Sequence, residues 1–170
     1  KDIKKLDKLK VNEELKEKLK KIFQEIFTME EKVHKERNIS LHEIGSLDTL
    51  LDILGFLLAK EFLKISSFSV GPIPLGSGFV ETSHGKISVP APLTESFLKS
   101  YLVIPQKGIG ETVTPTGALI LKSFFKSVKE APPIYLEKIG VGFGNKKVKD
   151  YPNALKGYLG KVDEKKEEII

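Results

Sequence analysis

Residues 46–78 read SLDTLLDILGFLLAKEFLKISSFSVGPIPLGSG, and within this stretch a long apolar segment gives way to short extended ones. From about Ser46 to Leu63 the leucines recur at helical spacing and no proline intervenes, which predicts a helix. Beyond it glycine and proline become frequent, and apolar residues alternate with others, first at Phe68 and Val70, as in short strands. This change of periodicity favours an α+β fold over a regular βαβ series.

The segments on either side continue this pattern of long helices followed by short strands. Upstream, apolar positions at helical spacing predict an amphipathic helix from Asn12 to Arg37, with Asn12 as its N-cap. The elements predicted downstream are a strand through Ile87 and Val89, a short helix opened by Pro90-Ala91-Pro92, a helix from Thr114-Pro115 to about Val128, and extended segments at Ile134–Val141 and Leu155–Val162. We therefore expect N-terminal long helices packed with a mixed sheet of short strands and two shorter helices.

The composition is that of one globular domain. The chain has 170 residues, of which 40% are hydrophobic and 30% charged, enough to bury a core. It has no cysteine, which excludes disulfides, zinc-thiolate sites and thiol catalysis. No apolar run approaches the length of a membrane span and nothing resembles a signal peptide, so we expect a cytoplasmic protein without a membrane partner. We expect residues 1–170 to be a single domain cut from a longer chain, with 1–11 as a linker or frayed start and 163–170 as a solvated tail.

The positive charge does not indicate a nucleic-acid partner. The formal net charge is +5, but many of the lysines lie in the first forty residues, interleaved with aspartate and glutamate. Such alternation is typical of a solvated helix face. No module that combines basic and aromatic residues stands out, so we predict no binding to nucleic acid.

Two carboxylates in the apolar helix are the strongest candidates for chemistry. Asp48 and Asp52 fall one turn apart on one face, beside two small residues, while the rest of the helix surface is nearly all apolar. A carboxylate buried in such surroundings needs a partner. His42 and Glu43 come just before this helix, and one imidazole with up to three carboxylates makes an oxygen and nitrogen metal site. We predict a metal site from these four residues, with His84, which follows a glycine-rich turn, as the next candidate ligand.

A structural role for the same carboxylates stays open. Asp48 near the helix start could cap the helix and interact with its dipole, and Asp52 could pair with a lysine. This alternative explains Asp48 well. It explains Asp52 less well, because Asp52 lies too deep in the helix to cap it.

The predicted helix start at Thr114-Pro115-Thr116-Gly117 is a candidate phosphate site. Proline at the first helical position leaves the amides of Thr116 and Gly117 free, and such helix starts bind phosphate or carboxylate. Most helix starts simply cap themselves, which is the alternative here. We name Thr114, Thr116 and Gly117 as candidate nucleotide-binding residues.

A glycine-rich segment from Gly140 to Lys146 is a second candidate for phosphate. It has the spacing of neither a dinucleotide fingerprint nor a P-loop. Backbone exposed at Gly142 and Gly144, with Lys146 behind it, still suits a phosphate group. The glycine-rich link from Gly71 to Gly78 is a weaker third candidate, since it reads equally well as a tight turn.

These same segments resemble a known family. The run Leu41-His42-Glu43-Ile44-Gly45-Ser46-Leu47-Asp48, with Asp52 following, is similar to the HEVGxxDxxxD signature of the LarC family, the nickel insertion proteins of the nickel-pincer nucleotide pathway. The resemblance spans roughly Glu30 to Gly160, in order. It continues through Pro74-Leu75-Gly76-Ser77-Gly78, the later Thr82, His84 and Gly85, Val89-Pro90-Ala91-Pro92, Glu111 to Gly117, Glu137-Lys138-Ile139-Gly140 and Pro152-Asn153.

The resemblance implies a CTP-dependent metal-inserting enzyme of the lyase type. Members of the family insert nickel into pyridinium-3,5-bisthiocarboxylic acid mononucleotide, using CTP and a divalent metal. The candidate phosphate-binding segments would then bind CTP or the substrate nucleotide, with Mg²⁺ or Mn²⁺ bridging phosphates to carboxylates. A cysteine-free set of histidine and carboxylate ligands suits a donor that must surrender nickel to the sulfur and carbon atoms of the organic ligand.

Family members also begin with an aspartate- and glycine-rich strand segment and end in a separate C-terminal domain, neither of which matches this chain. We therefore expect it to hold part of an active site, with the catalytic residues unassigned and homo-oligomerisation of the longer chain open. One alternative is a non-catalytic nickel- or nucleotide-binding carrier domain. Another is an interaction domain with a packed acidic helix, which would bind no metal.

Overall fold

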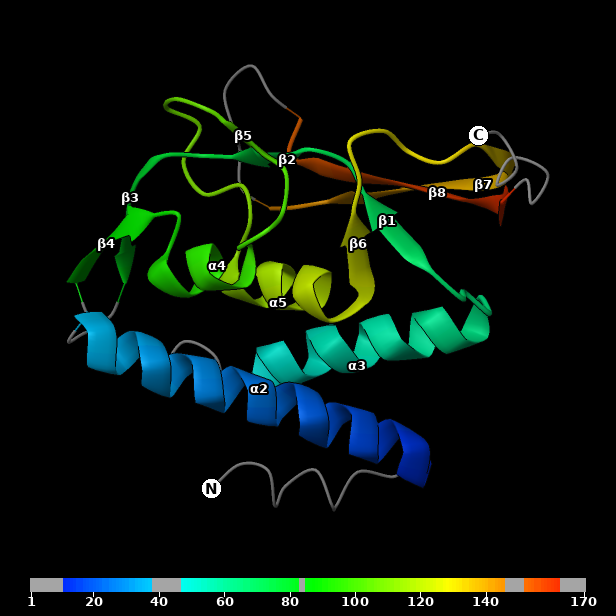
Figure 1. Cartoon of the computed structure of the whole chain (residues 1–170), viewed down its shortest axis with the longest axis horizontal. Coiled ribbons are helices and arrows are strands. Elements are labelled where there is room, and N and C mark those ends of the chain that lie inside the picture. Colours follow the sequence, from blue (N-terminus) through cyan, green and yellow to red (C-terminus); the bar gives the residue numbers. More distant parts are fainter. Residues whose placement is uncertain (1–10, 38–46, 83–84, 146–151, 163–170) are drawn as a thin grey trace, which may run out of the picture.

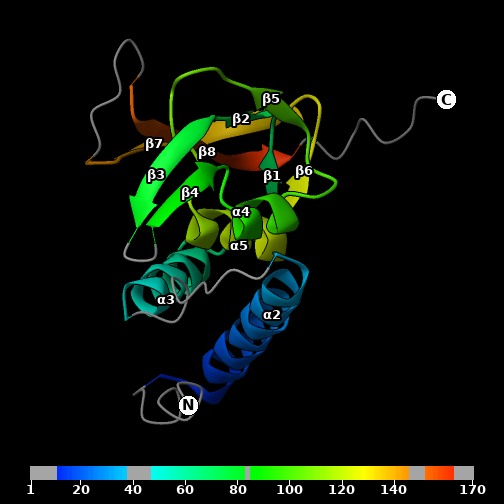
Figure 2. The same cartoon turned by 90° about the vertical axis from the view of Figure 1, so that its left-hand side faces the viewer.

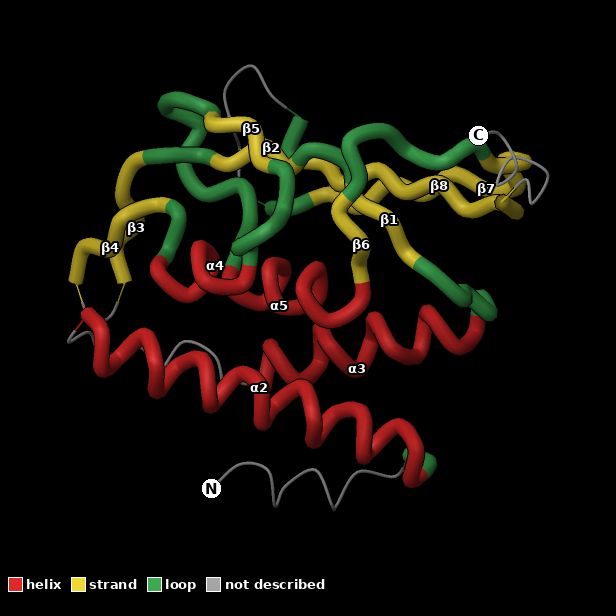
Figure 3. Tube along the Cα trace, in the orientation of Figure 1, coloured by secondary structure: helices red, strands yellow, loops and turns green. Residues whose placement is uncertain are grey.

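The computed structural model describes residues 11–37, 47–82, 85–145 and 152–162. The helices lie on one side of the molecule and most of the strands on the other (Figures 1 and 3). In chain order the elements are α2 (Glu13–Arg37), α3 (Leu47–Phe62), β1 (Phe68–Val70), β2 (Ile73–Leu75), β3 (Gly78–Thr82), β4 (Gly85–Val89), α4 (Pro92–Phe97), β5 (Val103–Pro105), α5 (Pro115–Phe124), β6 (Phe125–Ser127), β7 (Ile134–Phe143) and β8 (Ala154–Val162). This confirms the predicted α+β class.

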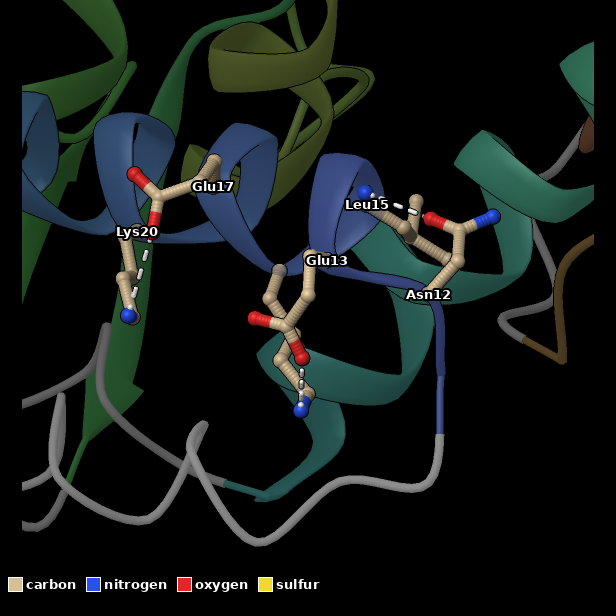
Figure 4. A network of polar contacts seen from close by, with 6 residues as sticks. Asn12, Glu13, Leu15, Glu17 and Lys20 are labelled. Atoms are coloured by element: carbon tan, nitrogen blue, oxygen red, sulfur yellow. Dashed lines mark hydrogen bonds and ion pairs between the residues drawn. The ribbon is translucent and has the colours of Figure 1, made fainter.

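Helix α2 forms as the sequence predicts. The side-chain oxygen of Asn12 accepts a hydrogen bond from the backbone N–H of Leu15 at 2.8 Å, so Asn12 is the N-cap (Figure 4). Ion pairs such as Lys20–Glu17, at 3.2 Å, lie along the solvent side of the helix. The opposite side is buried and contributes Leu15, Leu19, Ile22, Phe23, Ile26 and Val33 to the core.

The core lies between α2, α3 and the helical pair α4 and α5. Figures 1 and 2 show α4 and α5 between the two long helices and the strands. Phe97 of α4, Leu119 of α5 and Ile53 of α3 have no exposed surface. No described residue of the β7–β8 hairpin belongs to this core cluster or packs against it.

The strands form pairs instead of the single mixed sheet that we predicted. Among the described residues, β1 pairs with β6 and β2 with β5, both in parallel, and the antiparallel hairpins are β3–β4 and β7–β8. The parallel strands have three residues each, and Pro74 in the middle of β2 has no N–H to donate to a ladder. Such short, interrupted strands do not extend into a wide sheet.

The predicted helix from Thr114 to about Val128 is too long. Helix α5 ends at Phe124, and Phe125 begins β6. The ring of Phe125 packs on those of Phe68 and Phe56, with centroids 4.8 and 6.0 Å away. These aromatic contacts stabilise the extended conformation at Phe125, where a helix was predicted.

Tyr101 fixes the place where α5 ends. Its hydroxyl lies 2.9 Å from the carbonyl oxygen of Leu121 and 2.8 Å from that of Phe125, and it can donate to either. Burial raises the pKa of Tyr101, which keeps the hydroxyl protonated as a donor.

In the part of the chain that the structure describes, no helix is both long and apolar enough to cross a membrane.

Candidate functional site

The orientation of α3 decides where its carboxylates lie. Its buried side is formed by Thr49, Ile53 and Leu57. Leu51 and Phe62 face outward, with 55% and 85% of their surfaces exposed. Although the helix is apolar nearly all round, as predicted, part of that apolar surface is open in the described structure.

Asp48 and Asp52 lie on this open side. Both side chains are exposed, so our premise that the two carboxylates are buried is wrong. The physical reason is that Thr49, Ile53 and Leu57 form the side of α3 that meets the core, and the two aspartates lie on another side of the helix. Among the described residues no lysine or arginine forms an ion pair with either aspartate. The structure therefore gives no support to the alternative in which Asp52 pairs with a lysine.

The predicted five-residue metal site is described only in part. His42, Glu43 and His84 lie outside the described residues. Within the described ranges, no three histidine, cysteine, aspartate or glutamate side chains come together to hold a metal ion. Asp48 and Asp52, one turn apart and open to solvent, can offer carboxylate oxygens from one face of α3 but need further ligands.

The start of α5 caps itself. Thr114 is the N-cap, Pro115 is at the first helical position, and the hydroxyl oxygen of Thr114 accepts a hydrogen bond from the N–H of Gly117 at 3.1 Å. The prediction of two free amides is therefore wrong for Gly117, because a threonine at this position satisfies the amide itself. The N–H of Thr116 has no acceptor within the helix, since it belongs to the first turn.

A pair of threonines joins the start of α3 to the start of α5. The hydroxyl oxygens of Thr49 and Thr116 lie 3.4 Å apart, although 67 positions separate the two residues. Thr49 is 3% exposed and Thr116 is half-buried, so this contact is partly buried. The candidate metal segment and the candidate phosphate segment thus meet at their helix starts. Sequence reasoning missed Thr49, whose signal was a single hydroxyl on an otherwise apolar helix.

Two loops that precede α5, one at Gly76 and one from Gly110 to Thr112, are in close contact. The N–H of Gly76 donates to the hydroxyl of Thr112 at 3.0 Å, and that hydroxyl donates to the carbonyl of Pro74 at 2.7 Å. A Cβ at position 76 would lie 1.7 Å from the carbonyl oxygen of Gly110. The glycine-rich link from Gly71 to Gly78 is thus a packed structural element that holds the chain leading into α5.

The second candidate phosphate segment is mostly strand. Gly140 and Gly142 are part of β7, opposite Gly157 and Leu155, and the N–H of Gly144 donates to the carbonyl of Asn153 at 2.9 Å. The strand predicted to end at Val141 therefore continues to Phe143, because the apolar residues that alternate with the glycines extend it. Lys146 lies outside the described residues.

Comparison with known proteins identifies the family. The nickel insertion protein family matches residues 1–170, and the chain belongs to it, which confirms the resemblance found in the sequence. A protein of Dictyoglomus thermophilum named putative nickel insertion protein is 43% identical over 161 residues, which cover 94% of this chain and 42% of that protein. One from Geotalea daltonii is 39% identical over 92% of this chain and 41% of its own length.

A Thermotoga relative (strain RQ2), named pyridinium-3,5-bisthiocarboxylic acid mononucleotide nickel insertion protein, is 37% identical over 91% of this chain and 39% of its own length. The chain thus spans about two-fifths of the length of these curated relatives. No solved structure matches it.

Proposed function

We propose that this chain is part of an enzyme that inserts nickel into pyridinium-3,5-bisthiocarboxylic acid mononucleotide in a CTP-dependent, lyase-type reaction in the cytoplasm. Nickel is the cargo of this reaction, and the mononucleotide and CTP are its other substrates. The name of the Thermotoga relative supports the choice of acceptor. One structural observation carries the proposal: the contact between Thr49 and Thr116 brings the start of α3, with its two aspartates, to the start of α5.

The metal half of the proposal rests on the chemistry of α3. Asp48 and Asp52 supply oxygen donors on an exposed face, where a metal can arrive and leave. Because the chain has no cysteine, no thiolate competes with the sulfur atoms of the substrate for nickel. We propose that His42, Glu43 and His84 complete the ligand set.

The nucleotide half rests on the start of α5. The positive end of a helix dipole favours phosphate, and the N–H of Thr116 is available to an acceptor outside the helix. Carboxylate oxygens fit Mg²⁺ or Mn²⁺, so Asp48 or Asp52 could share such an ion with the phosphates of CTP. We propose Thr114, Thr116 and Gly117 as the nucleotide-binding segment, with Gly142, Gly144 and Lys146 as the second choice.

Asp52→Asn separates a ligand role from a scaffold role. Because Asp52 is exposed and has no ion pair with a described residue, the change should alter the free energy of unfolding in EDTA by less than about 0.5 kcal/mol. Nickel at a hundredfold excess over its dissociation constant should stabilise the parent by about 2.7 kcal/mol, and this gain should disappear in the variant. Thermal melts with EDTA and with nickel measure both quantities.

Glu61→Gln is the matched control for Asp52→Asn, since Glu61 is an exposed carboxylate near the other end of the same helix. It should respond to nickel as the parent does. If Asp52→Asn keeps the full response to nickel, Asp52 is not a ligand. A loss of several kcal/mol in EDTA would assign Asp52 to the scaffold.

The alternative of a non-catalytic carrier differs in what happens to CTP. An enzyme should convert CTP to CMP, with release of its two terminal phosphate groups, in proportion to the nickel that enters the mononucleotide, whereas a carrier should bind nickel or nucleotide and release no CMP. The measurement is chromatography of nucleotides alongside nickel analysis of the product. The Dictyoglomus thermophilum relative at its full length, run in parallel, shows whether a missing activity belongs to the remaining three-fifths of such a protein.

A further inference from the structure

The β7–β8 hairpin has one apolar face that nothing in the described structure covers. The strand register places Phe143, Val141 and Ile139 opposite Ala154, Lys156 and Tyr158 on this face. A β-bulge between Leu136 and Lys138 shifts the alternation by one residue, which brings Leu136 onto the same face. We call this set the apolar hairpin face; its large members are Leu136, Ile139, Val141, Phe143, Tyr158 and Val162, each between 48% and 78% exposed.

The charges of the hairpin are arranged to leave this face apolar. Lys138 and Lys161 belong to the opposite face by the same register. Among the described residues, Lys156 is the one lysine on the apolar hairpin face, and its ammonium group lies 5.3 Å from the centre of the Tyr158 ring. A long lysine side chain can turn toward the rim of an interface while its methylene groups stay in contact with apolar surface.

The hairpin needs a second layer to be stable. It does not pack against the core, and a two-stranded antiparallel ribbon is at best marginally stable in water. A contiguous apolar patch of several hundred Å² marks an interaction surface. The long strands and their alternating pattern are therefore explained by a partner that covers the apolar hairpin face.

We propose that the partner is a second copy of this chain, packed face to face through the same surface. With about 100 Å² open on each side chain of this size, six of them offer roughly 600 Å² per copy, which approaches the ~800 Å² per partner of a standard interface. A twofold axis sets an identical flat, apolar surface of the same length against the first. If this twofold axis lies between the two hairpins and runs across their strands, the two copies of Lys156 lie toward opposite ends of the interface, so their like charges do not meet. This inference is independent of the proposed reaction.

Sedimentation equilibrium over a range of concentrations tests the dimer. The parent chain should associate reversibly, and Ile139→Lys, which puts a charge in the centre of the face, should weaken the dimer by about tenfold or more. Leu155→Lys is the matched control, because Leu155 is 80% exposed on the opposite face of the same hairpin. It should leave the association constant within about twofold of the parent value.

Single cysteines give a second readout, since the chain has none of its own. Mild oxidation should link Ile139→Cys into dimers at protein concentrations where Leu155→Cys stays monomeric. A parent chain that is monomeric at ~100 μM overturns the proposal and leaves the face to another part of the longer polypeptide or to a different protein. Equal weakening by Ile139→Lys and Leu155→Lys, or equal cross-linking of the two cysteine variants, also overturns it.

Discussion

Gly76→Ala is expected to lower the free energy of unfolding by about 3 kcal/mol or more. The added Cβ would lie 1.7 Å from the carbonyl oxygen of Gly110, so the contact is with backbone and no change of rotamer relieves it. Separating the two loops also breaks the hydrogen bonds through which the hydroxyl of Thr112 joins Gly76 to Pro74. Equilibrium unfolding in urea measures the loss as a lower midpoint.

Gly55→Ala is the control for this substitution and should have the opposite sign. Gly55 lies inside α3, and a Cβ added there meets nothing within 4 Å. Replacing an unobstructed helical glycine with alanine should raise the free energy of unfolding by about 0.5–1 kcal/mol. If Gly76→Ala leaves the midpoint unchanged or raises it as Gly55→Ala does, the close approach of Gly76 and Gly110 does not hold in solution.

Phe97→Ala should cost about 3–5 kcal/mol. The side chain of Phe97 has no exposed surface and belongs to the core cluster around α2, α4 and α5. Removing the ring leaves a cavity that surrounding side chains from three helices fill only in part, because their backbones are held by other contacts. The midpoint of urea unfolding, read by circular dichroism at a fixed protein concentration, reports the change.

Phe62→Ala shows whether that cost comes from burial or from the loss of any phenyl ring. Phe62 is 85% exposed near the end of α3, so its removal should change the free energy of unfolding by less than about 0.5 kcal/mol. A small effect of Phe97→Ala would mean that the helices do not enclose Phe97 as described. A large effect of Phe62→Ala would show that the outer side of α3 is covered in solution.

The helices could be predicted from the sequence because their signals are local. Asn12 and the spacing of the apolar residues after it are enough to begin α2 and to choose its buried side. The end of α5 could not be predicted in this way. It depends on Phe68 and Tyr101, which are distant in the sequence and reach Phe125 only in the folded chain.

The sequence could predict which residues belong to the candidate site but not how these residues lie relative to one another and to the core. The positions of Asp48 and Asp52 on one helix face follow from the sequence, but their exposure depends on which side of α3 meets the core. Thr49, on the buried side, contacts Thr116, and no periodicity links two residues so far apart. In the same way, the pairing of Gly142 with Leu155 continues the strand past Val141, where the sequence pattern predicted its end.

The short contact between Thr49 and Thr116 has a thermodynamic consequence for the proposed sites. A ligand that displaces the first turn of α3 must also displace the first turn of α5 or break this contact, and the free energy involved is shared by both. Linkage then requires that a metal on α3 changes the affinity of a nucleotide at α5 by the same factor as the nucleotide changes that of the metal. If a ligand at either proposed site displaces this contact, dissociation constants measured with one ligand alone will differ from those that hold when both are bound.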